Sequence, residues 1–167
     1  PSGHLTKIGT PTMGGVLIIF AVLLSTFLWA DITNVYVWLV MLSIVGFGLV
    51  GFVDDYVKIH RGQSMGLNVW QKLVAQIVVA LGIGLFFYSS PGYSTELSVP
   101  FFKSFTPDLG PLYVPFAILV IVGCSNAVNL TDGLDGLAIG PVIVASLAYM
   151  VVAYAAGNRV IADYLLI

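Results

Sequence analysis

Five long apolar stretches constrain the fold of this chain more than any other feature. Each is close to the roughly 20 helical residues that span the hydrocarbon core of a bilayer. Backbone groups inside lipid must satisfy their own hydrogen bonds, so we expect helices and not strands. The predicted spans are 14–30, 35–53, 70–88, 112–130 and 138–156. We therefore predict an all-α integral membrane protein: one polytopic domain over residues 1–167, with about five transmembrane helices, belonging to a larger helical bundle.

The composition favours lipid over water as the surrounding solvent. Hydrophobic residues make up 59% of the chain and charged residues 8%, against about 25% charged residues in ordinary globular domains. So few charges cannot cover a water-facing surface, which leaves a soluble domain with an unusually apolar core as the weaker alternative. The net charge of −2 and the lack of a basic run argue against nucleic acid as a partner.

Five spans place the connections alternately on two sides of the membrane. The first side receives 1–13, 54–69 and 131–137, and the second receives 31–34, 89–111 and the tail after Gly157. Basic residues number four on the first side (Lys7, Lys58, Arg61 and Lys72) and two on the second (Lys103 and Arg159). By the positive-inside rule, the first side is cytoplasmic. We expect His60 to be a loop residue there, and the short apolar pieces of 89–111 to allow an external hairpin.

The unusual polar clusters all fall on the predicted cytoplasmic side. They are the segments 4–15, 54–58 and 126–136. Three loops that converge on one face of a membrane protein can build a site, whereas loops scattered over both faces cannot. This coincidence predicts a functional site at the cytoplasmic face.

The Asp54–Asp55 pair places two adjacent carboxylates at the edge of the membrane. Their mutual repulsion is costly near lipid, and a divalent cation, a bound proton or a nearby lysine would relieve it. Mg²⁺ often joins one or two carboxylates to substrate phosphates, and an aspartate can also act as a general base. Lys58 shares a helical face with both aspartates if the helix continues. The alternative is an interfacial ion pair that only caps the helix.

The segment 126–136 combines carboxamides, carboxylates and glycines. Asn126 and Asn129 are one helical turn apart near the end of a span, where carboxamides need a cavity or another helix as partner. Asp132 and Asp135 lie beyond them, and Gly133 lets the backbone approach a ligand closely. The spacing does not fit a calcium loop, whose ligands alternate at every second position. The alternative is a helix-end turn capped by aspartate.

The N-terminal segment 10–15 precedes the first span and reads Thr-Pro-Thr-Met-Gly-Gly. It is not a P-loop, because it lacks the Gly-Lys-Ser/Thr ending. It does bring hydroxyls, a glycine pair and a helix N-terminus together, which is a suitable geometry for an anion, and Lys7 adds a positive charge. The alternative is an ordinary transition from loop to helix.

Together the three clusters resemble the signature motifs of the polyprenyl-phosphate phospho-sugar transferases, and most closely those of the bacterial phospho-N-acetylmuramoyl-pentapeptide transferases. Segment 4–15 resembles their first cytoplasmic motif, 52–58 their aspartate motif and 126–138 their nucleotide-site motif. The Thr-Pro-Thr-Met-Gly-Gly and Thr-Asp-Gly forms favour this family over relatives that act in teichoic-acid, O-antigen and N-glycan synthesis.

The resemblance implies transfer of phospho-N-acetylmuramoyl-pentapeptide from its UDP carrier to undecaprenyl phosphate, with Mg²⁺ as cofactor, giving lipid I and UMP. It implies an active site on the cytoplasmic face of the bacterial cytoplasmic membrane. Asp54 and Asp55 would be the catalytic pair, with Lys58 holding phosphate beside them. The implied substrate-binding residues are Lys7, Thr12, Lys72, Asn126, Leu130, Asp132, Gly133 and Asp135, and Asn129 would face the metal.

In one respect this chain departs from the pattern of the family. Members of the family carry a further metal-binding Asp and a His-rich motif in later cytoplasmic loops, and nothing after Gly136 supplies either. We therefore expect an internal piece of the enzyme that is inactive alone.

The alternatives are another polyprenyl-phosphate sugar-phosphate transferase or an intramembrane prenyltransferase, whose carboxylates are spaced three and four apart. A transporter would carry charges within its spans, and these spans carry almost none. A homodimer is allowed by the sequence but not required.

Overall fold

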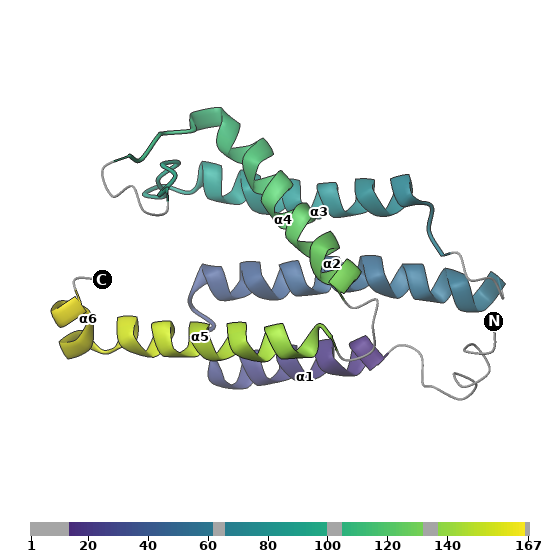
Figure 1. The fold of residues 1–167 in the computed structure, drawn as a ribbon, viewed down its shortest axis with the longest axis horizontal. Helices are drawn as coiled ribbons and strands as arrows, with labels where there is room; N and C mark the ends of the chain where they lie inside the picture. The colour runs from purple at the N-terminus through teal and green to yellow at the C-terminus, as the bar shows by residue number, and fades with distance from the viewer. Residues whose placement is uncertain (1–13, 62–65, 100–104, 132–136, 166–167) are drawn as a thin grey trace. The chain divides into compact units, whose positions relative to one another are not determined.

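The computed structural model describes residues 14–61, 66–99, 105–131 and 137–165 (Figure 1). Nearly all of the regular structure in these ranges is helical. The helices are α1 (Gly14–Trp29), α2 (Val35–Arg61), α3 (Val69–Ser89), the short 3-10 helix η2 (Gly110–Leu112), α4 (Tyr113–Thr131), α5 (Ile139–Gly157) and α6 (Arg159–Leu165). The prediction of an all-α membrane protein is confirmed.

Each of the five predicted spans corresponds to one of the helices α1 to α5. Four helices in the described ranges are long and apolar enough to cross a membrane, namely α2, α3, α4 and α5. α1 is apolar too, but its 16 residues fall just short of the usual spanning length. The short helix α6 lies in the tail after Gly157.

The end of α2 differs most from the prediction. The expected span stopped at residue 53, but the helix continues to Arg61, so Asp54, Asp55, Lys58 and His60 are helical and not loop residues. No Gly or Pro interrupts 54–61, and an ion pair one turn apart supports this stretch. At 1.5 Å per residue the helix is about 40 Å long, which exceeds the roughly 30 Å hydrocarbon core. The polar turns thus extend beyond a membrane-spanning length.

The described chain divides into two compact units, residues 1–122 and 123–167, and each is described by itself. In the first unit, α2 contacts both α1 and α3 (Figure 1). Glycines allow these close approaches: a Cβ at Gly48 would lie 2.6 Å from Ile19 Cδ1, and one at Gly46 would lie 2.9 Å from Val79 Cγ1. Small residues at helix contacts are the usual means of close packing in membrane proteins.

The buried face of α3 is narrow. Gln76, Ala80 and Gly84 are buried at successive four-residue intervals, and Gly84 faces Val114 and Ala117 at the start of α4. Most large apolar side chains of the described helices are exposed. Exposed apolar faces are expected where lipid and other helices surround a helix.

At one end of the α2–α3 pair, aromatic rings from four segments pack together. Tyr36 of α2 stacks on Phe87 of α3 with ring centroids 6.2 Å apart. Phe87 also packs against Tyr93 at 4.6 Å, and Tyr93 against Tyr113 of α4 at 6.1 Å. With Phe86, these residues form what we call the aromatic cluster. The apolar rings and hydroxyl groups suit a membrane–water interface.

The connection after α3 contains the expected hairpin pairing in a minimal form. Glu96 and Asp108 form an isolated antiparallel bridge. The Leu97 N–H donates to the Pro107 carbonyl at 2.9 Å, and the Leu109 N–H donates to the Thr95 carbonyl at 3.1 Å. These bonds hold the described parts of the 89–111 connection against one another.

The second unit contains the end of α4, together with α5 and α6. α5 contacts α6. A shallow apolar pocket lies between the last turn of α4, at Val128 and Thr131, and the start of α5, at Pro141 and Val142.

Candidate functional site

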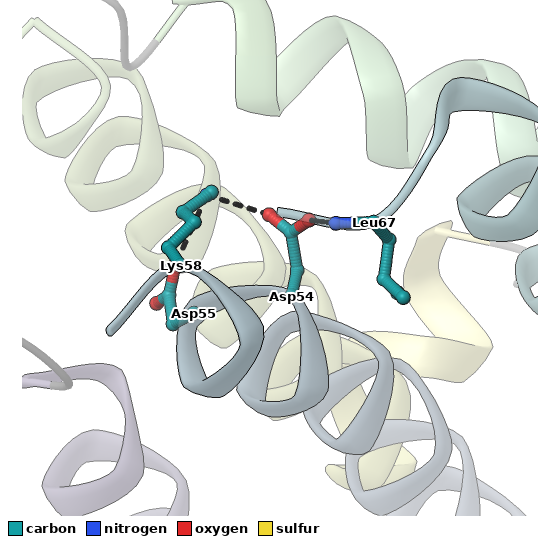
Figure 2. A network of polar contacts seen from close by, with 4 residues as sticks. All are labelled: Asp54, Asp55, Lys58 and Leu67. Atoms are coloured by element: carbon teal, nitrogen blue, oxygen red, sulfur yellow. Dashed lines mark hydrogen bonds and ion pairs between the residues drawn. The ribbon is translucent and has the colours of Figure 1, made fainter. Parts of the chain in front are cut away.

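The polar turns at the end of α2 carry a three-residue charge cluster (Figure 2). Lys58 follows Asp54 by four residues and Asp55 by three, so all three side chains fall on adjoining parts of one helical face. The Lys58 Nζ lies 2.6 Å from Asp54 Oδ2 and 3.2 Å from Asp55 Oδ1. The ion pairing that the sequence allowed is therefore formed, with one ammonium shared by two carboxylates.

Asp54 is the buried member of the pair. Its side chain is 11% exposed, against 49% for that of Asp55. The Leu67 N–H donates a hydrogen bond of 2.8 Å to Asp54 Oδ1, so each carboxylate oxygen has a different partner (Figure 2). Buried charges need such partners to offset the loss of water. The orientation of this carboxylate is fixed from two sides.

Asp55 has a more open environment. It lines a pocket whose other walls are apolar or glycine residues of α1 and α2, including Val16, Ile19, Gly51 and Phe52. A second pocket continues along the same two helices through Phe20 and Leu23 and shares Val16, Ile19 and Phe52 with the first. Asp55, with its partner Lys58, thus stands at the end of an apolar groove, an arrangement that suits a molecule with a polar head and an apolar tail.

The start of α3 brings backbone and positive charge to Asp54. Leu67 precedes Asn68, whose N–H donates to the Gln71 side chain at 3.1 Å and helps begin the helix. Half-buried Lys72, in the first turn, acts electrostatically on Asp54. Lys72 thus adds a second positive charge near Asp54, where α2 ends and α3 begins.

The remaining predicted site residues fall in two groups. Asn126, Asn129 and Leu130 lie in the last turns of α4 in the second unit, with Asn129 exposed and Leu130 80% exposed. The others lie outside the described residues: Lys7, Thr12, Asp132, Gly133 and Asp135. Of the predicted set, the structure thus joins Asp54, Asp55 and Lys58 by direct contacts, and it places Lys72 near enough to act on the charge of Asp54.

Sequence reasoning missed the backbone contribution to the site. The Leu67 N–H is a main-chain donor, and neither its side chain nor its spacing from Asp54 marks it as a partner. The Asn68–Gln71 spacing does indicate a helix start, but not that this start lies against α2. Within the described ranges, no group of three or more His, Cys, Asp or Glu residues could hold a metal ion.

Comparison with known proteins assigns the family. Residues 37–167 match the family model described as glycosyl transferase family 4. The chain belongs to glycosyl transferase family 4. Residues 7–19 also match the phospho-N-acetylmuramoyl-pentapeptide-transferase signature 1. Both matches agree with the resemblance that the three polar clusters indicated.

Individual relatives carry the name of the same transferase. A phospho-N-acetylmuramoyl-pentapeptide-transferase of Maridesulfovibrio salexigens is 60% identical over 163 residues, covering 97% of this chain and 45% of the relative. Those of Citrifermentans bemidjiense and Pelobacter propionicus are 55% and 52% identical over 165 residues, covering 99% of this chain and 46% of each relative. The chain thus spans about half the length of these family members.

Proposed function

We propose that the whole protein transfers phospho-N-acetylmuramoyl-pentapeptide from its UDP carrier to undecaprenyl phosphate, releasing UMP and forming lipid I. An oxygen of the acceptor phosphate would attack the sugar-linked phosphorus of the donor. The new diphosphate bond forms as the bond to UMP breaks. Family membership and the names of relatives at 52–60% identity support this assignment.

The observation that carries the proposal is the Asp54–Lys58–Asp55 cluster beside an apolar groove. The acceptor joins a phosphate to a polyprenyl chain, so its two parts need a charged site and an apolar surface next to each other. Asp55 lines the groove, is half exposed and is paired with Lys58, so a phosphate whose tail stays in lipid would be met there by Lys58 or by a cation held on Asp55. An ion pair that only capped the end of α2 would not need this groove.

The roles of the charged residues follow from where charge changes in the reaction. Phosphoryl transfer is accelerated mainly by positioning and by groups that stabilise charge on the phosphates. Lys58 and Lys72 supply positive charge for this, and the aspartates hold Lys58 in place. One aspartate would also accept the acceptor proton when the phosphate binds as its monoanion.

Mg²⁺ fits this cluster in one particular way. The ion is commonly held by one or two carboxylates together with substrate phosphates. In the described cluster, Asp55 is the carboxylate that can bind Mg²⁺, because both oxygens of Asp54 already have partners. When bound, the ion would neutralise phosphate charge. Asn129 on α4 stays a predicted metal contact, and a homodimer stays a prediction.

The decisive assay measures UMP release from UDP-N-acetylmuramoyl-pentapeptide by the full-length protein. We expect release to require both undecaprenyl phosphate and Mg²⁺. UMP release that continues without the lipid acceptor would refute the proposal. A parallel reaction with UDP-N-acetylglucosamine separates it from the alternative of another sugar-phosphate transferase, since that donor would then be preferred.

We also propose that the charge cluster faces the cytoplasm of a bacterial cell. Cysteine labelling tests this in the full-length protein, in a background where Cys124, which is exposed, and every other cysteine of that protein are replaced by serine. A cysteine at His60, at the end of α2, should react only from the cytoplasmic side. A cysteine at Thr33, in the turn before α2, should react only from outside. The reverse pattern would overturn the orientation.

A further inference from the structure

Gly66 makes the closest contact of any described glycine with the charge cluster. A Cβ built on Gly66 would collide with Asp54 Oδ1, and it would lie 2.6 Å from the Asp54 carbonyl oxygen and 2.9 Å from its Cγ. Side-chain Cβ atoms essentially never approach other atoms this closely. The segment before α3 therefore lies directly on the Asp54 residue, with no space for a side chain larger than hydrogen.

The nature of the opposing atoms distinguishes Gly66 from the other tightly packed glycines. Gly46 and Gly48 face the methyl groups of Val79 and Ile19, which can move by changing rotamer. Gly66 faces a backbone oxygen inside α2 and a carboxylate that is already bonded at both oxygens. Among the described glycines, positive φ angles occur at Gly92 and Gly110 only. Gly66 is thus required for space and not for backbone conformation.

The close approach of Gly66 also places the next residue. The Leu67 N–H reaches Asp54 Oδ1 at 2.8 Å because the backbone at position 66 lies against the carboxylate. This bond fixes one oxygen of Asp54, while Lys58 holds the other at 2.6 Å. A methyl group at position 66 would push the segment away and remove the Leu67 donor.

We propose that Gly66 is a positioning residue that acts through Asp54 in the reaction proposed above. It contacts Asp54 and not the substrate. Its role is to let the backbone hold the carboxylate in one orientation. This inference rests on the proposed function for its effect on turnover, while the Gly66–Asp54 contact can be tested without any activity.

The first test compares Gly66→Ala with Gly82→Ala in the full-length protein. Gly82 lies on an exposed part of α3, and a Cβ there would meet nothing within 4 Å. We expect Gly66→Ala to lower kcat about 10- to 100-fold, because displacing a group that positions an active site by about 1 Å can have an effect of this size. The KM for the UDP-linked donor should change less than about 2-fold if binding is little affected, and Gly82→Ala should resemble the wild type. An unchanged kcat in Gly66→Ala would overturn the proposal.

A double-mutant cycle separates positioning from general damage to the fold. If Gly66 acts through the carboxylate, Gly66→Ala should lower the residual turnover of Asp54→Asn by less than about 2-fold, since coupled residues are not additive. An equal loss in both backgrounds would mean a structural role and would overturn the inference.

Amide hydrogen exchange tests the contact itself. Exchange in a peptide that contains Leu67 should rise in both Gly66→Ala and Asp54→Ala, and stay at the wild-type level in Gly82→Ala. Unchanged exchange in Gly66→Ala would refute the contact. If the wild-type protein releases no UMP while the exchange pattern is as expected, the proposed function fails and the Gly66–Asp54 contact stands.

Discussion

The two ends of the α2–α3 pair are held together by different kinds of contact. At the polar end, Asp54, Asp55, Lys58 and the Leu67 N–H form a few short, charge-assisted contacts. At the other end, the aromatic cluster holds the same two helices through ring packing. Ring packing spreads its energy over many weak contacts, whereas each partner of a buried charge is needed individually.

This difference separates activity from stability along one helix pair. Loss of a single ring at the aromatic end should lower the stability of the fold by a small amount and leave turnover unchanged. Loss of one charged group at the polar end leaves its partners uncompensated and changes the charge offered to a phosphate. Substitutions at the two ends should therefore affect different measurements.

The largest effect is expected for Asp54→Asn. The substitution keeps the shape but removes the charge that pairs with Lys58, together with any proton transfer. In the full-length protein, kcat for UMP release should fall by about 10²- to 10⁴-fold, and Asp55→Asn should also reduce it. Asp31→Asn, at the other end of the helix pair, should retain nearly full activity. Full activity of both site variants would contradict the assignment of this end as the reactive one.

Lys58→Gln should have the next largest effect. Without the ammonium, two carboxylates face each other and the approaching phosphate. We expect about a 100-fold loss of kcat, comparable to the loss of one preorganised group that stabilises charge in a transition state. Because Lys58 is partly exposed, salt screens the interaction and the loss should shrink at high ionic strength. A loss that does not depend on salt would indicate that packing, and not charge, is the main contribution of Lys58.

The sequence predicted the helices and the charge pairing at the polar end, but not the aromatic cluster at the other end. Apolar length located the helices to within a residue or two, except at the end of α2. Length alone could not locate that end, because hydropathy falls at Asp54 although the helix continues through an ion pair to Arg61. The Asp54–Lys58 pairing followed from spacing along one helix. The contact with Leu67 did not, because a main-chain donor carries no side-chain signal and lies 13 residues away.

Phe87→Ala tests the aromatic end. Phe87 contacts Tyr36, Phe86 and Tyr93. Aromatic pairs contribute about 0.5–1.5 kcal/mol each beyond area burial, and Phe87 is only half buried. We expect a loss of about 1–3 kcal/mol, seen as a lower midpoint of thermal unfolding in detergent, with kcat changed less than about 2-fold.

Tyr88→Ala is the matched control for Phe87→Ala. Tyr88 is the next residue of α3 and is exposed, with no ring contact in the described part of the chain. Its removal should shift the midpoint less than that of Phe87. An equal shift in both variants would mean that the aromatic cluster is not what holds this end.

The smallest effect is expected at Asp108, in the connection beyond the aromatic cluster. Thr95 Oγ1 and the Gly110 N–H both donate to Asp108 Oδ1, the latter at 3.0 Å, and these bonds lower the pKa of Asp108 below its ordinary 3.8. A lowered folded-state pKa adds stability above pH 3.8, and that stability is lost as the pH falls through the folded-state value.

At neutral pH, Asp108→Ala should speed amide exchange around Gly110 and leave activity unchanged. Asp108→Asn keeps an oxygen that can accept both bonds, so its exchange should lie between the wild type and the alanine variant. If Asp108→Asn instead exchanged as fast as Asp108→Ala, the charge of Asp108 and not its acceptor geometry would hold this connection.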